Sequence, residues 1–244
     1  RTLADDRERV ATIRVIPFFS CGAKLPILVA IAGGIVSWFG VSNSDAITYG
    51  MYVLGIVVAI LAVIVMRNTT MRGDTPPFIM ELPAYHAPQA KALALHLWDK
   101  TKHFVKKAFT IILASTILIW FLLHFAWDWS YLADEQMEES ILAGIGKLIQ
   151  PLFTPLGFGS QLGAFGWVFV VAAIMGLIAK ENVIAGFGTM AAVIMAAVGG
   201  AYDGEADADG ISAAAIMIEQ TGITIPGLIS FIAFNMTTIP CFAA

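Results

Sequence analysis

The sequence is poor in charged residues and in cysteine. Asp, Glu, Lys and Arg make up 13% of its 244 residues, about half the share found in soluble domains, while 58% of residues are hydrophobic. Two cysteines, Cys21 and Cys241, are too few for a disulfide framework. No Gly-x-Ser-x-Gly and no Gly-x-x-x-x-Gly-Lys-Ser/Thr run occurs, so neither nucleophilic catalysis nor phosphate binding is indicated within the chain. The composition predicts an all-α polytopic membrane protein, and the residues give little support for catalysis.

Apolar runs of membrane-spanning length recur along the chain. A helical crossing needs about 20 apolar residues. We expect about six crossings, some broken by proline or glycine, with amphipathic helices on both sides of the membrane. The expected crossings lie near 27–39 (after a turn at 17–26), 46–66, 108–127, 163–180, 183–199 and 223–244. They divide the chain into a first gate-like region 1–66, a cytoplasmic loop and amphipathic helix 67–107, a third crossing with an extracytoplasmic segment 108–162, and a second gate-like region 163–244.

The charges are unevenly placed. Segment 67–107 holds seven Lys/Arg and three acids, whereas 128–162 holds five acids and one lysine, and 200–222 holds five acids and no base. Because basic loops remain in the cytoplasm, this pattern predicts that 67–107 is cytoplasmic and that both acidic segments lie on the opposite side.

A short charged stretch interrupts the longest apolar region. Lys180-Glu181-Asn182 lies at the centre of the run 163–200, where charges are costly unless they face protein, water or a turn at the interface. Two interpretations remain open: a hairpin turn at the cytoplasmic surface, or a polar break lining an ion path. A similar Ala-Lys step, Ala23-Lys24, interrupts apolar sequence between Pro17 and Pro26. We call 17–26 and 176–184 the two Ala-Lys segments.

Candidate metal ligands fall into two groups. Cys21 and Cys241 lie near prolines, which free backbone carbonyls, and thiols favour soft and borderline metals. The alternative is that each cysteine is a small buried apolar residue. Met80, Glu81 and His86 form a weaker mixed set, for which a proline-rich packing loop is the competing explanation.

Several motifs, taken together and in order, are similar to those of the ferrous iron transport protein B family. They are Arg1-Thr2-Leu3, the segment 17–26 (PFFSCGAKLP), the loop 80–88 (MELPAYHAP), the segment 176–184 (GLIAKENVI), and Phe234-Asn235 followed by 240–244 (PCFAA). One departure is Pro83-Ala84, where the family often has two prolines.

The resemblance implies a multi-pass permease for Fe²⁺ in the inner membrane of a bacterium or archaeon. It implies Cys21, Cys241 and Glu181 along the path, with gate or structural roles for Lys24, Lys180, Asn182, Pro17, Pro26 and Pro240. It implies no tightly bound cofactor here, because GTP and Mg²⁺ would bind a separate N-terminal domain, and both ends of the chain look like cuts through a longer protein. Expected partners are Fe²⁺, the bilayer, that GTP-binding domain, a small FeoA-type accessory protein and further copies of the chain, but no nucleic acid.

Two other functions remain possible from the residues. A gate-type carrier of a nucleoside-like solute would need a polar pocket and would leave the cysteines without a role. A non-transport membrane assembly subunit would use its charges only structurally, and replacing both cysteines by serine would then change nothing.

Overall fold

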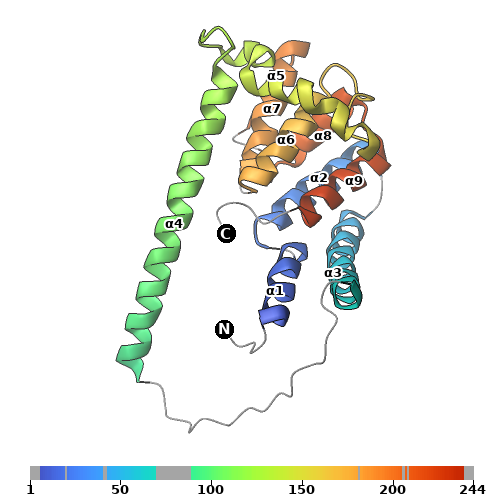
Figure 1. The fold of residues 1–244 in the computed structure, drawn as a ribbon. Helices are drawn as coiled ribbons and strands as arrows, with labels where there is room; N and C mark the ends of the chain where they lie inside the picture. The colour runs from blue at the N-terminus through green and yellow to red at the C-terminus, as the bar shows by residue number, and fades with distance from the viewer. Residues whose placement is uncertain are drawn as a thin grey trace.

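The part of the chain that the structure describes is built from helices (Figure 1). A computed structural model describes residues 6–19, 21–40, 43–69, 89–180, 182–204, 207 and 209–238. Within these ranges there is no strand, only one isolated bridge between Phe125 and Tyr131. The α-helices are α1 (Asp6–Val15), α2 (Lys24–Phe39), α3 (Ser44–Thr69), α4 (Ala90–His124), α5 (Ile141–Ile149), α6 (Trp167–Ile178), α7 (Asn182–Val198), α8 (Ile211–Thr221) and α9 (Ile225–Thr237). The 3₁₀ helices are η1 (Ile16–Phe18), η2 (Asp134–Glu139) and η3 (Gln150–Leu156), and the expected all-α class is confirmed.

Two of the described helices, α3 and α4, are long and apolar enough to cross a membrane. Their 26 and 35 residues correspond to about 39 and 52 Å at about 1.5 Å per residue, against a hydrocarbon core about 30 Å thick. Only 17% of the apolar window of each is buried inside the chain, so most of this apolar surface is exposed. The crossing expected at 108–127 ends earlier, at His124, because Phe125 is extended and pairs with Tyr131.

Helices α2 and α5 to α9 pack into one apolar body beside α3 and α4, whereas α1 lies apart from it and contacts α3 and η1 (Figure 1). Helix α8 contacts both α2 and α7. Its fit against α2 depends on Gly33 and Gly34, because a Cβ atom there would come within 2.9 Å of Ile211 and Ile218, respectively. Helix α8 lies in the acidic segment 200–222, ahead of the expected crossing at 223, and no helix was predicted there. A helix of 11 residues is too short to be recognised as a crossing from its sequence, and it is buried only because α2 and α7 pack against it.

The helices at the other expected crossings are short. α2, α6, α7 and α9 have 16, 12, 17 and 13 residues, which is about 18 to 26 Å each at about 1.5 Å per residue. Each is shorter than the roughly 20 residues of a straight crossing. The described helices therefore match the positions of the expected crossings, and the number of crossings stays a prediction.

The turn expected at 17–26 is shorter than predicted. Helix α2 starts at Lys24, so Pro26 lies inside its first turn. The first four backbone N–H groups of a helix have no intrahelical acceptor, so a proline there removes no hydrogen bond. Pro17 likewise lies at the start of η1.

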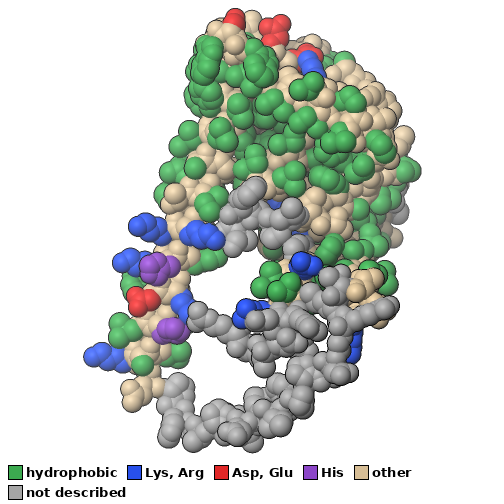
Figure 2. Space-filling model, viewed as in Figure 1, with side chains coloured by type: hydrophobic (Ala, Val, Ile, Leu, Met, Phe, Trp, Pro, Cys, Tyr) green, Lys and Arg blue, Asp and Glu red, His purple; other side chains and the backbone are tan. Residues whose placement is uncertain are grey.

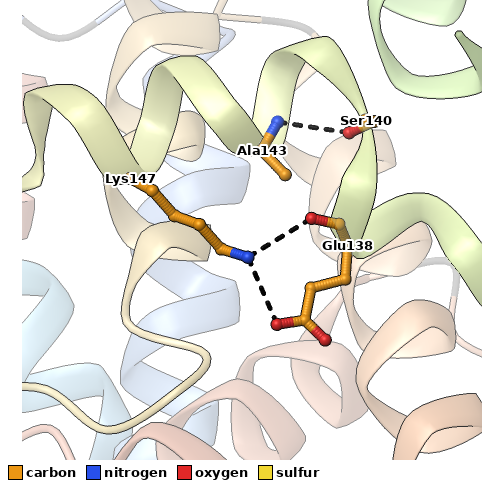
Figure 3. Close-up of polar contacts among 4 residues, drawn as sticks. All are labelled: Glu138, Ser140, Ala143 and Lys147. Atoms are coloured by element: carbon orange, nitrogen blue, oxygen red, sulfur yellow. Dashed lines mark hydrogen bonds and ion pairs between the residues drawn. The ribbon is translucent and has the colours of Figure 1, made fainter. Parts of the chain in front are cut away.

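The acidic segment after α4 contains a 3₁₀ helix followed by an α-helix. Ser140 is extended and separates η2 from α5. Its Oγ accepts a hydrogen bond from the Ala143 N–H at 3.1 Å, which caps α5, while Lys147 Nζ lies 3.3 Å from both the backbone oxygen and Oε1 of Glu138 (Figure 3). The side-chain cap therefore favours a new helix start at Ile141 over continuation of η2.

Charge is separated along the molecule. Figure 2 shows basic and histidine side chains along the first half of α4, and acidic side chains gathered at the opposite end of the same view. The bases of this half-helix are Lys91, Lys100, Lys102, Lys106 and Lys107.

Candidate functional site

The first buried lysine is Lys24, at the start of α2. Its side chain is 3% exposed. Lys24 Nζ donates hydrogen bonds to the backbone oxygen of Met236 at 2.6 Å and to that of Phe19 at 3.2 Å. It thereby joins the amino end of α2 to the carboxyl end of α9 and to the residue after η1.

The second buried lysine is Lys180, between α6 and α7. It is 1% exposed, and the preceding Ala179 is extended, with φ −151° and ψ 111°. Lys180 Nζ donates to the backbone oxygen of Asn235 at 2.7 Å and to Thr238 Oγ1 at 3.3 Å. Because the chain leaves the helical conformation between α6 and α7, the Lys180 ammonium group reaches the carboxyl end of α9, which Lys24 also reaches.

The carboxyl end of α9 receives both ammonium groups on consecutive carbonyls. The last four carbonyls of a helix have no intrahelical partner, and they carry the partial negative charge of the helix dipole. Ammonium donors suit such oxygens, because charge-assisted hydrogen bonds are short and strong. The ends of α2, α6 and α9 accordingly meet at the lower edge of the helical body in Figure 1.

Asn235 is fixed by two further contacts. Its Nδ2 donates to the Phe231 oxygen at 3.0 Å, and the side chain is 3% exposed. A Cβ atom on Gly176 would come within 2.5 Å of Asn235 Oδ1, so α6 and α9 approach closely only because residue 176 is glycine. This contact places Gly176, from one of the two Ala-Lys segments, directly against α9.

The predicted gate residues are only partly brought together. Lys24 and Lys180 converge on α9, whereas Asn182 donates from its Nδ2 to Thr116 Oγ1 on α4 at 3.2 Å. Cys21 is exposed, and its backbone oxygen accepts from the Lys24 N–H at 3.1 Å. Met236 and Thr238 were not anticipated, because backbone acceptors and a hydroxyl at a helix end leave no sequence motif.

Most of the predicted metal ligands lie outside the described residues. These are Cys241, Glu181, Met80, Glu81 and His86, together with the structural Pro240. Within the described part of the chain, no three His, Cys, Asp or Glu side chains form a group able to hold a metal ion. The ligand assignments therefore stay predictions.

The described residues define a class first: they are all-helical and include two exposed helices of membrane-spanning length. Family models then cover most of the chain. One described as "Nucleoside recognition" matches residues 105–244, and one described as "Ferrous iron transport protein B C terminus" matches residues 48–100.

Curated relatives agree with the second model. The chain is 34% identical over 249 aligned positions, which cover all of it, to a protein named Fe(2+) transporter FeoB from Campylobacter jejuni. It is 35% identical over 190 positions, 78% of its length, to proteins of the same name from Salmonella typhimurium and Escherichia coli K12. The chain spans 37% of the first relative's length and 23% of the other two. No solved structure matches it. The chain belongs to the ferrous iron transport protein B family, as its motifs predicted.

Proposed function

We propose that this chain forms part of a membrane permease for Fe²⁺. The observation that carries the proposal is the similarity of every part of the chain to a relative named as a Fe(2+) transporter. The chain spans a minority of that relative's length, so transport is assigned to the whole protein in which the chain occurs. Fe²⁺ is the substrate here and not a resident cofactor.

A location in the membrane is supported by exposed apolar surface. Large apolar side chains of α3 and α4, such as Ile60, Val65 and Ile117, are more than half exposed. In water such surface would be unfavourable, whereas in a bilayer it contacts lipid chains. We further propose a multi-pass protein of a bacterial inner membrane, with the basic half of α4 in the cytoplasm and the acidic segments outside.

An ion path at broken helices is supported by the burial of Lys180 at the break between α6 and α7. Non-helical backbone is tolerated at membrane depth where it is enclosed by protein, and Lys180 is enclosed and hydrogen-bonded. This favours the polar break over a turn at the surface. We propose that sulfur of Cys21 and Cys241 replaces part of the water shell of Fe²⁺, and that Glu181 offsets its charge.

The alternative of a nucleoside-like solute rests on the description of one family model. That model covers residues that are also part of the full-length similarity to an iron transporter, so it does not favour the alternative. Measuring nucleoside uptake beside iron uptake separates the two.

The proposal is tested by Fe²⁺ uptake in cells that lack their own iron-uptake systems. The whole protein is compared with Cys21→Ser, Cys241→Ser and Glu181→Gln at matched membrane abundance. Loss of a group that contacts the ion is expected to lower uptake on the order of tenfold or more. Glu138→Gln is the matched control for Glu181→Gln, because Glu138 lies in an exposed ion pair with Lys147.

Two results would contradict parts of this proposal. Wild-type uptake in all three variants would remove the ligand assignment and return the cysteines to packing. Nucleoside uptake without Fe²⁺ uptake by the unaltered protein would remove the iron permease itself.

A further inference from the structure

The two Ala-Lys segments share one target, although they lie far apart in the sequence. Lys24 is bound to the Met236 oxygen 212 residues away, and Lys180 to the Asn235 oxygen 55 residues away. These acceptors are successive carbonyls of the last turn of α9. A single helix end therefore holds both segments.

Stability by itself does not account for this arrangement. Removing an ammonium group from water is costly, and replacing a buried ion by well-packed apolar residues is often neutral or stabilising. Here two like charges are 3% and 1% exposed and are bound to neighbouring oxygens. Mutual repulsion adds to the cost of burying them, so a conformational role is the better explanation.

Close contacts at two glycines also link α9 to the elements around it. Gly55 of α3 lies against the Phe18 oxygen, where an added Cβ would come within 3.1 Å, and Phe19 of the same turn accepts from Lys24. On the other side Gly176 contacts Asn235, whose carbonyl binds Lys180. Each lysine is thus one link in a continuous chain of contacts that runs from one Ala-Lys segment through α9 to the other.

We propose that Lys24 and Lys180 are positioning residues that couple the two Ala-Lys segments through the carboxyl end of α9. When one lysine leaves its carbonyl, the last turn of α9 loosens and the other lysine loses a fixed acceptor. A movement of either segment is then transmitted to the other. As a step in transport the coupling rests on the proposed function, whereas the contacts themselves do not.

The test is hydrogen exchange measured by mass spectrometry on the whole protein in lipid nanodiscs. The variants are Lys24→Met, Lys180→Met and the double substitution. A hydrogen bond to a charged group contributes about 1.5–3 kcal/mol, so exchange in the last turn of α9 should rise about tenfold or more in each single variant. Lys24→Met should also speed exchange of the Asn182 and Val183 amides, which donate to Ala179 and Lys180.

Lys147→Met is the matched control, because this lysine of α5 is 44% exposed and pairs with Glu138 of η2. Exchange in the last turn of α9 and at the Asn182 and Val183 amides should stay within about twofold of the unaltered protein, because an exposed ion pair contributes little. If the methionine variants do not accumulate, Lys24→Gln and Lys180→Gln keep an amide donor without the charge. A smaller rise at the same amides is expected for them, because a neutral donor bonds a carbonyl more weakly than an ammonium group does.

Unchanged exchange in the last turn of α9 would overturn the proposal. A rise confined to that turn, with 182–183 unaffected in Lys24→Met, would also overturn it, because each lysine would then be only a local cap. Fe²⁺ uptake is measured on the same variants. Absence of uptake by the unaltered protein, together with the exchange changes, would refute the iron permease and leave the coupling in place.

Discussion

At the scale of single residues, Asp207 shows how one side chain can set a helix start. Its carboxylate accepts from the Ala213 N–H at 2.7 Å, from the Ser212 N–H at 3.1 Å and from the Tyr202 hydroxyl at 2.9 Å. Burial by itself raises the pKa of Asp207, but these hydrogen bonds outweigh it, and the pKa lies below the ordinary value. Burial and the nearby Asp207 charge raise the pKa of Tyr202.

Replacing Asp207 by alanine is expected to destabilise the protein by about 1 kcal/mol at neutral pH, as for other lost helix caps. Because the folded pKa is depressed, this contribution is fully present above the unfolded pKa of about 3.9 and is lost as pH falls through the folded pKa. The midpoint of denaturant-induced unfolding of the protein in detergent, measured from pH 7 down to about pH 3, tests this. Asp209→Ala, on the same loop, is the control, and equal destabilisation by both would refute the capping role.

At the scale of elements, helix boundaries follow local capping more than apolar runs. α2 accepts Pro26 in its first turn, and the acidic segment after α4 is divided at Ser140. The cap at Ser140 is fully buried, whereas the Lys147–Glu138 pair beside it is exposed (Figure 3). These two neighbouring contacts should therefore differ in their contribution to stability.

Ser140→Ala is expected to cost about 1 kcal/mol or more, since a buried backbone donor at Ala143 loses its acceptor. Lys147→Met should cost less than about 0.5 kcal/mol, because exposed ion pairs contribute little. Both are measured as shifts of the unfolding midpoint under identical detergent conditions. A larger loss for Lys147→Met than for Ser140→Ala would contradict this order.

At the scale of the whole molecule, length, exposure and charge separation together predict an orientation. α4 carries its lysines in the first half and none in the second, while exposed apolar side chains occur along both halves. The acidic η2 segment follows the second half (Figure 2). If the second half crosses the bilayer, its two flanks must lie on opposite sides.

Single cysteines at Lys102, Ile117 and Glu139 test this orientation. A membrane-impermeant maleimide should label position 102 only from the cytoplasmic side and position 139 only from the outer side. Position 117, which is 59% exposed in the half of α4 that has no lysine, should be protected from both sides. Site-resolved mass spectrometry on vesicles of each orientation measures this, and labelling of 102 and 139 from the same side would exclude a crossing by α4.

The sequence by itself determined the helical class, the two long helices and the family, because length, hydropathy and ordered motifs are properties of local sequence. It also singled out both lysines, since charge within an apolar run is conspicuous wherever the chain folds. Only the tertiary structure brought Lys24 and Lys180 to the same turn of α9, because their acceptors are backbone oxygens exposed by the end of a helix. The burial of helix α8 was likewise decided by the tertiary structure, since its buried residues are covered by α2 and α7.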